Sequence, residues 1–227
     1  MGRLAEAIKA LAEGRPVFIH DSSSREDEVD MVFHASLITA DKVAVMRREG
    51  GGLICYAMPL NVGRVLGLRY MDEILSEAGY GELTSKRLRY GDPPNFSLWV
   101  NHRAVVTGIR DSDRARTIRE LDAVVEKVLD GRVEEAVRKF REEFVAPGHV
   151  PVLLGRGLNV RRGHTELSLA LAEMGGLRPS VVIVEVLSES GAATVEQAER
   201  LARRFDGVVI EGEDILRAWQ SSARTSL

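Results

Sequence analysis

The sequence is poor in cysteine, with Cys55 as its single example in 227 residues. One cysteine cannot form a disulfide within the chain. No group of cysteines and histidines has the spacing of a structural zinc site either. This cysteine usage is typical of a protein that works in a reducing cytosol.

Long apolar runs and an excess of one charge are also lacking. No apolar run reaches the roughly 20 residues that a membrane-crossing helix needs. Residues 1–17 interrupt their apolar positions with Glu, Lys and Arg, unlike the core of a signal peptide. The formal net charge of -3 gives no general attraction to nucleic acid or anionic lipid. We therefore expect a soluble, cytoplasmic protein that acts on small molecules and binds neither nucleic acid nor membrane.

The chain has enough apolar residues, 44% of the total, to bury a substantial core. It contains no internal repeat, low-complexity tract or flexible linker between domains. These features predict a single domain over residues 1–227.

Helix and strand patterns alternate along the chain. Leu4, Ala7, Ile8 and Leu11 recur at helical spacing before Gly14 ends the helix. Further helices are predicted at 39–49, with Thr39 as N-cap, from about Ser112, within 131–144, from about His164 and from about Thr194. Strands are predicted at 16–20, 29–35, 53–58, 96–107, 149–154, 181–186 and 207–210. The alternation indicates helices on both faces of a sheet, parallel or mixed, with residues 61–94 as a partly helical surface excursion.

The first group of candidate functional residues is the segment REDEVD, from Arg25 to Asp30, between two apolar strands. A charged run of this kind is often a solvated loop. Clustered carboxylates can also bind a hard divalent cation, and a carboxylate near that cation can act as a base.

The second group is the segment RRGHTE, from Arg161 to Glu166, where Gly163 permits a tight turn before a helix. The first amides of that helix, with Thr165 and the arginines, suit a phosphate or another anion. His164 can ligate a metal or transfer a proton. An ordinary helix start with surface arginines remains the alternative.

Three further positions carry weaker signals. His149 follows a Pro-Gly turn at the start of an apolar strand, where histidine is often structural. Glu185 ends the apolar run from Val181, so it either faces solvent at the strand end or is paired inside. Thr107 precedes a glycine at a strand-to-helix junction, where its hydroxyl can contact a substrate or simply belong to a turn.

Taken together, the chain resembles the 3,4-dihydroxy-2-butanone-4-phosphate synthase family over nearly its whole length, in the ordered blocks REDEVD, GGLICYAMP, VTGIRDSDRARTI, FVAPGHV, RRGHTEL and VIVEV. The resemblance implies a three-layer α/β/α sandwich, of the α+β class, around a mixed, twisted sheet. It implies a homodimer with active sites at the subunit interface. It also implies a carbon-carbon lyase of riboflavin biosynthesis that uses Mg²⁺ or Mn²⁺ to convert ribulose 5-phosphate into the four-carbon precursor and formate.

The same resemblance assigns roles residue by residue. Glu26 and His164 are the implied metal ligands, and His149, Glu185 and Glu28 the implied catalytic residues. The implied substrate-binding residues are Arg25, Glu26, Asp30, Thr107, Arg161, Arg162, Gly163, His164, Thr165 and Glu185. Asn101 departs from the family pattern, which more typically has an aspartate at that position.

Two other functional classes remain open from the sequence. One is a nucleotide- or RNA-associated protein related to the threonylcarbamoyl-adenylate synthases, which resemble this fold but need a basic nucleotide cleft. The other is a noncatalytic sugar-phosphate-binding or dimerisation module. A GTP cyclohydrolase II fusion is not expected, since its zinc site needs several cysteines.

Overall fold

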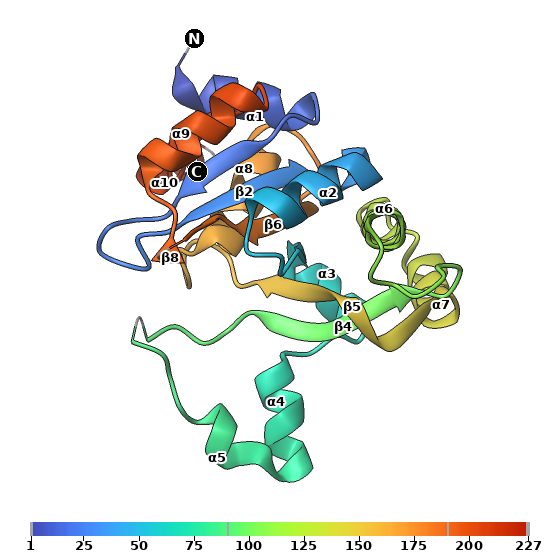
Figure 1. Cartoon of the computed structure of the whole chain (residues 1–227). Helices are drawn as coiled ribbons and strands as arrows, with labels where there is room; N and C mark the ends of the chain where they lie inside the picture. The colour runs from blue at the N-terminus through green and yellow to red at the C-terminus, as the bar shows by residue number, and fades with distance from the viewer. Residues whose placement is uncertain (1, 90, 190, 226–227) are drawn as a thin grey trace.

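A mixed sheet of seven strands runs through the molecule, and helices cover both of its faces (Figure 1). The computed structural model describes residues 2–89, 91–189 and 191–225. In chain order the strands are β1 (Val17–His20), β2 (Val29–His34), β3 (Cys55–Pro59), β4 (Phe96–His102), β5 (Phe144–Gly155), β6 (Val181–Glu185) and β9 (Val208–Glu211). Across the sheet they lie in the order β4-β5-β3-β6-β2-β1-β9.

The pairing of these strands explains why the sheet is mixed. β1 runs parallel to β9, and β3 runs parallel to β5. The pairs β1–β2, β2–β6, β3–β6 and β4–β5 are antiparallel. A short ribbon of β7 (Leu187–Ser188) and β8 (Gly191–Ala192) follows β6. The predicted mixed sheet is therefore confirmed.

The helices form the two outer layers of the sandwich. One face packs against α2 (Ala40–Glu49), α3 (Leu60–Val65), α6 (Asp111–Leu129), α7 (Val133–Glu143) and α9 (Val195–Arg204). The opposite face packs against α1 (Arg3–Ala12), α8 (His164–Met174) and α10 (Gly212–Thr225). Each layer buries one apolar stripe, because a helix of this kind must hide its apolar side against the sheet. The three-layer α/β/α arrangement is confirmed.

Two predicted helix starts are visible in the backbone. Thr39 is the N-cap of α2, and its hydroxyl accepts a hydrogen bond of 3.3 Å from the Lys42 amide. Thr194 begins α9 with a reciprocal capping box, in which the Gln197 side chain accepts from the Thr194 amide. Such side chains satisfy backbone N–H groups that have no partner inside the helix.

The predicted surface excursion is also present. After α3 the chain forms α4 (Met71–Leu75), the π-helical turn η2 (Ser76–Tyr80) and α5 (Gly81–Thr84), which project away from the sheet (Figure 1). Leu83, 65% exposed, is the least covered large apolar side chain of these three helices. β4 follows this excursion and begins at Phe96.

Two absences seen in the sequence have structural counterparts. Cys55 is buried as a free thiol in β3. Within the described residues, every helix is too short or too polar to span a lipid bilayer.

Candidate active site

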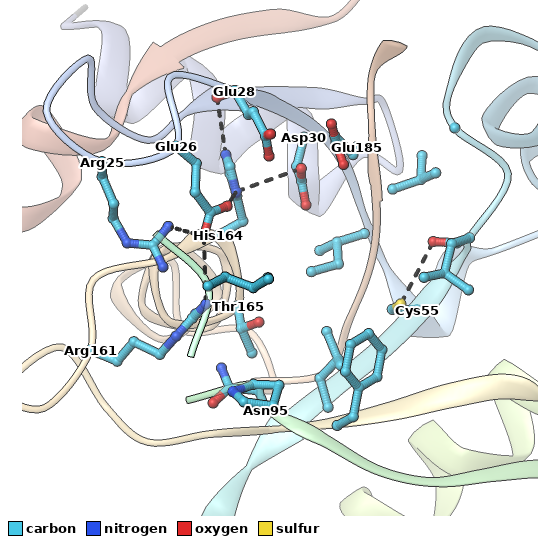
Figure 2. Close-up of a pocket in the computed structure, with 18 of the residues that line it drawn as sticks. Arg25, Glu26, Glu28, Asp30, Cys55, Asn95, Arg161, His164, Thr165 and Glu185 are labelled. Atoms are coloured by element: carbon cyan, nitrogen blue, oxygen red, sulfur yellow. Dashed lines mark hydrogen bonds and ion pairs between the residues drawn. The ribbon is translucent and has the colours of Figure 1, made fainter. Parts of the chain in front are cut away.

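A cavity lies at the start of β2 and the end of β6, beside the start of α8. Its volume is about 560 Å³. Figure 2 shows the carboxylates of Glu26, Glu28, Asp30 and Glu185 gathered on one side, with Arg25 and Arg161 beside them. The lining residues with polar or ionisable side chains are Arg25, Glu26, Glu28, Asp30, Cys55, Arg89, Asn95, Arg161, His164, Thr165 and Glu185. Both charged segments singled out in the sequence therefore meet in one pocket.

The acidic turn between β1 and β2 is organised by the buried carboxylate of Asp21. This carboxylate accepts hydrogen bonds from the amides of Glu26 (3.2 Å) and Glu28 (3.1 Å). It also pairs with Arg25 at 3.0 Å. Although burial raises the pKa of Asp21, the charge of His164 and the backbone N–H groups outweigh it and lower that pKa. Asp21 thus stays ionised and folds the turn so that Glu26 faces the cavity.

The start of α8 supplies the opposite wall. Gly163 is its N-cap, and a Cβ placed there would lie 2.2 Å from Arg161 Nη1. A side chain at Gly163 would therefore displace this guanidinium. Arg161 donates to the buried carboxylate of Glu166 at 2.8 Å. Its Nε is buried and has no hydrogen-bond partner among the described residues.

His164 joins the two walls. Its Nε2 lies 3.1 Å from the carbonyl oxygen of Glu28 and donates a hydrogen to it. The Nδ1 atom then faces the acids, 3.8 Å from Glu26 and 3.6 Å from Asp30. The hydrogen bond to Glu28 fixes the ring so that Nδ1 is the nitrogen presented to the cavity.

A divalent cation fits the donor atoms at this junction. Asp21, Glu26 and His164 each offer one ligand atom, and these atoms lie within 4.8 Å of one another. Two carboxylates and one imidazole form a donor set of oxygen and nitrogen, which suits Mn²⁺ and is compatible with Mg²⁺. Asp21 was not among the residues predicted from the sequence, where it reads simply as the first residue of a turn.

The remaining acids of the cavity have raised pKa values. Asp30 and Glu185 are directly opposite each other on the antiparallel strands β2 and β6. Burial raises the pKa of both, and the charge of Asp30 raises that of Glu185 further. Burial, with the charges of Glu185 and Glu26, raises the pKa of Glu28 to about 7. A carboxyl group that titrates near neutrality can both accept and donate a proton.

Three predicted site residues lie elsewhere. Arg162 is exposed and is not part of the cavity lining. His149 is exposed, and its amide donates to Asn101 Oδ1 at 2.8 Å. The Thr107 amide donates to Asp113 at 3.0 Å, beside a glycine that touches Asn101. In the described part of the chain, Thr107 and His149 thus belong to a second cluster around Asn101, outside the cavity.

Glu166, Asp92 and Asn95 stabilise the cavity walls, and none of them was assigned a role from the sequence. Glu166 accepts from Asn95 Nδ2 at 2.7 Å and from the Arg156 amide at 3.0 Å. Asp92 lies 3.0 Å from Arg25 and 3.7 Å from Arg161. Glu166 had a signal, since it is an acid on a strongly apolar helix. Asp92 and Asn95 had none, because their partners lie far away along the chain.

Comparisons with known proteins identify relatives along most of the chain. The family model of 3,4-dihydroxy-2-butanone 4-phosphate synthase matches residues 5–218. A synthase of that name from Methanosarcina acetivorans is 40% identical over 224 aligned residues, covering 94% of this chain and 89% of the relative. The corresponding protein of Archaeoglobus fulgidus is 40% identical over 225 residues, covering 95% and 93%.

Solved structures give the same result. A crystal structure of 3,4-dihydroxy-2-butanone 4-phosphate synthase in complex with two magnesium ions matches with a TM-score of 0.78 at 26% identity. The match covers 98% of this chain and 99% of that structure. The sequence and the fold lead to one conclusion: the chain belongs to the 3,4-dihydroxy-2-butanone 4-phosphate synthase family of enzymes.

Proposed function

We propose that this enzyme converts D-ribulose 5-phosphate into L-3,4-dihydroxy-2-butanone 4-phosphate and formate, a step of riboflavin biosynthesis. The observation that carries the proposal is the approach of Glu26 to His164, at 3.8 Å, inside one cavity. These residues are 138 positions apart, by subtraction of their numbers, and come from the two charged segments recognised in the sequence. Family membership supports the same reaction.

The phosphate of the substrate would bind where α8 begins. The first N–H groups of a helix have no partner within it and carry partial positive charge. Arg25 and Arg161 add two guanidinium groups on the same side of the cavity. The Nε of Arg161 faces the carboxylate of Asp92 at 3.7 Å, which orients this guanidinium. Thr165, also in the lining, completes this subsite.

Glu26 and His164 would hold a divalent cation, Mg²⁺ or Mn²⁺, with Asp21 close enough to contribute. When bound, such an ion supplies positive charge that polarises the ketone of the substrate and keeps neighbouring oxygens in one geometry. The mixed oxygen and nitrogen donors described above support this assignment.

The acids Glu28 and Glu185 would move protons. The reaction removes the C3 proton, expels the C1 hydroxyl as water, rearranges the carbon skeleton and adds water to release C4 as formate. Water lost and water gained balance, so product and formate contain all the substrate atoms. Both carboxyl groups line the cavity, and the pKa of each is raised. Their raised pKa suits groups that alternate between acid and base.

We assign Thr107 and His149 to the active site of a second copy of the chain. Both residues lie outside the cavity of their own chain, Thr107 in the loop after β4 and His149 within β5. Exposed apolar side chains lie in the same part of the chain: Val106 precedes Thr107, and Trp99 and Val145 belong to β4 and β5. Apolar residues exposed in this way are typical of a face that is covered in an oligomer. A homodimer would cover this face and would bring His149 to the partner's cavity.

The decisive experiment measures formate release from ribulose 5-phosphate by the purified protein, with and without chelator. We expect Glu26→Ala and His164→Ala to lower turnover by about 100-fold or more, because each removes a metal ligand. A matched control is Glu134→Ala, an exposed acid on α7. Turnover that survives chelation would contradict the metal assignment. Absence of formate with any divalent metal would contradict the reaction and favour a noncatalytic sugar-phosphate module.

A further inference from the structure

His20, the last residue of β1, connects the acidic turn to a neighbouring strand. Its Nδ1 lies 2.6 Å from Glu211 Oε2, at the end of β9. Its Nε2 lies 3.0 Å from Asp27 Oδ1, in the middle of the turn. The side chain is 12% exposed, so the ring is fixed between these partners with little access to water. His20, Asp27 and Glu211 are all outside the cavity lining.

The bond to Asp27 reaches the turn at its least regular point. Asp27 has a φ of +58°, in the left-handed region that is costly for most residues with a side chain. It lies between Glu26 and Glu28, whose side chains face the cavity. Asp21 holds the backbone of this turn from the inside, through the amides of Glu26 and Glu28. His20 holds the same turn from the outside, through the Asp27 side chain.

The other end of the connection is rigid. β9 pairs in parallel with β1, and Glu211 is the register partner of His20. β9 also contacts α1, α9 and α10, so its position is fixed by the packed core. The imidazole therefore ties a turn, which lacks regular backbone pairing, to a well-supported part of the sheet.

Charge favours the same arrangement. Asp21, Glu26, Asp27 and Glu28 place four carboxylates in eight residues. Side by side, such groups repel one another and drive a turn to open. The hydrogen bond between His20 and Asp27 engages one of these carboxylates and holds it on the outer side of the turn, away from Glu26 and Glu28.

We propose that His20 is a positioning residue that clamps the acidic turn, and thereby holds Glu26 at the distance from His164 that a divalent cation requires. This inference rests on the proposed metal site and adds to it a residue that touches neither metal nor substrate. The hydrogen bond of His20 to Asp27 holds the neighbouring Glu26 in place, and its hydrogen bond to Glu211 attaches the turn to the sheet.

The test uses two substitutions of Asp27 that both tolerate a left-handed backbone. Asp27→Gly removes the acceptor and keeps the conformation, while Asp27→Asn keeps an acceptor oxygen for His20. The probe is Mn²⁺ alone, with free ion measured by electron paramagnetic resonance. We expect Asp27→Gly and His20→Ala to weaken Mn²⁺ binding by about tenfold, as residues behind metal ligands do. Asp27→Asn is expected to bind within about twofold of wild type.

A second readout needs no metal. Trypsin cleavage after Arg25 in the metal-free protein should be faster in Asp27→Gly than in Asp27→Asn, with circular dichroism unchanged. Equal Mn²⁺ affinity and equal rates of trypsin cleavage in all variants would contradict the proposal that His20 positions the acidic turn. Failure of wild type to bind Mn²⁺ would instead overturn the proposed metal site, and the cleavage rates would still decide whether His20 holds the turn.

Discussion

At the residue scale, Glu166 shows how a single buried acid can organise a binding wall. Its carboxylate accepts from Asn95, from the Arg156 amide and from Arg161, and its side chain is fully buried. These donors come from the return segment before β4, the loop after β5 and the approach to α8. Glu166 therefore fixes three segments around the proposed phosphate subsite.

Glu166→Gln tests this role. The glutamine side chain would turn its NH₂ group toward some of the N–H groups that now donate to the Glu166 carboxylate. Two donors would then face each other, and at least one buried N–H group would have no acceptor. We expect the free energy of unfolding to fall by about 2–3 kcal/mol, measured by urea denaturation. KM for ribulose 5-phosphate should rise more than kcat falls, since Arg161 loses its anchor. Unchanged stability and KM would show that the three donors find other acceptors.

His34 gives a pH dependence of stability that is separate from the active site. Its Nε2 donates to the Arg178 carbonyl at 3.0 Å, and its Nδ1 accepts from the Ser36 amide at 3.3 Å. Burial lowers the pKa of His34 below its ordinary value, against weaker opposing contributions from the hydrogen bond to the Arg178 carbonyl and from the charge of Asp122. The folded protein therefore holds this ring neutral under conditions in which the unfolded chain protonates it.

Below about pH 6.5 the unfolded chain binds a proton at His34 that the folded chain refuses, so stability falls with falling pH until the lowered folded pKa is reached. The slope from this group is at most about 1.4 kcal/mol per pH unit. The measurement is the free energy of unfolding by urea between pH 5 and pH 8. The His34→Gln variant should have a lower free energy of unfolding than wild type at pH 8, and that free energy should fall less than that of wild type when the pH is lowered. A slope equal to that of wild type would contradict this account.

At the scale of elements, the start of α9 is held by two reciprocal hydrogen bonds between Thr194 and Gln197. Thr194→Ala should lower the free energy of unfolding by about 1 kcal/mol, because an amide in the first turn loses its acceptor. Gln197→Ala removes the other bond and serves as the matched comparison. Urea denaturation of both variants provides the measurement, and no loss in either would mean that water caps this helix equally well.

Elements with strong periodicity could be predicted from the sequence, and those defined by long-range pairing could not. The spacing of Leu4, Ala7, Ile8 and Leu11 and the caps at Thr39 and Thr194 located helices within a few residues. The strand predicted at 149–154 is β5, which begins earlier, at Phe144. Its first half pairs with β4 across irregular registers, and Pro147 obscures any strand signal there.

The candidate site was predicted to a similar extent. The segments REDEVD and RRGHTE indicated Glu26, Asp30 and His164 as candidates, and Glu185 was noted as an acid that ends an apolar run, while the roles of all four came from the family resemblance. Asp21 was missed because its partners are backbone amides of its own turn, which leave no pattern in the sequence. Asp92 was missed because it meets Arg25 and Arg161 only once the chain is folded.

At the scale of the whole molecule, the cavity and the cluster around Asn101 are separate parts of one chain. If each active site takes one part from each subunit, a variant defective in the cavity should complement a variant defective in the cluster. Glu26→Ala damages the cavity, and His149→Ala damages the cluster around Asn101. In a hybrid dimer with shared sites, one site carries both defects and the other carries neither. An equal mixture that exchanges subunits should recover about a quarter of wild-type activity. Formate release after mixing, compared with each variant alone, gives the result, and no recovery would argue against shared sites.

The register of β2 against β6 also limits how the gene can vary. Asp30 stands opposite Glu185, while its neighbours Val29 and Met31 point into the core on the other face of the sheet. One codon gained or lost within this strand would invert the alternation, burying the acid in the core and turning an apolar side chain toward the cavity. Descendant sequences can therefore exchange residues here, but insertions and deletions in β2 should be eliminated by selection.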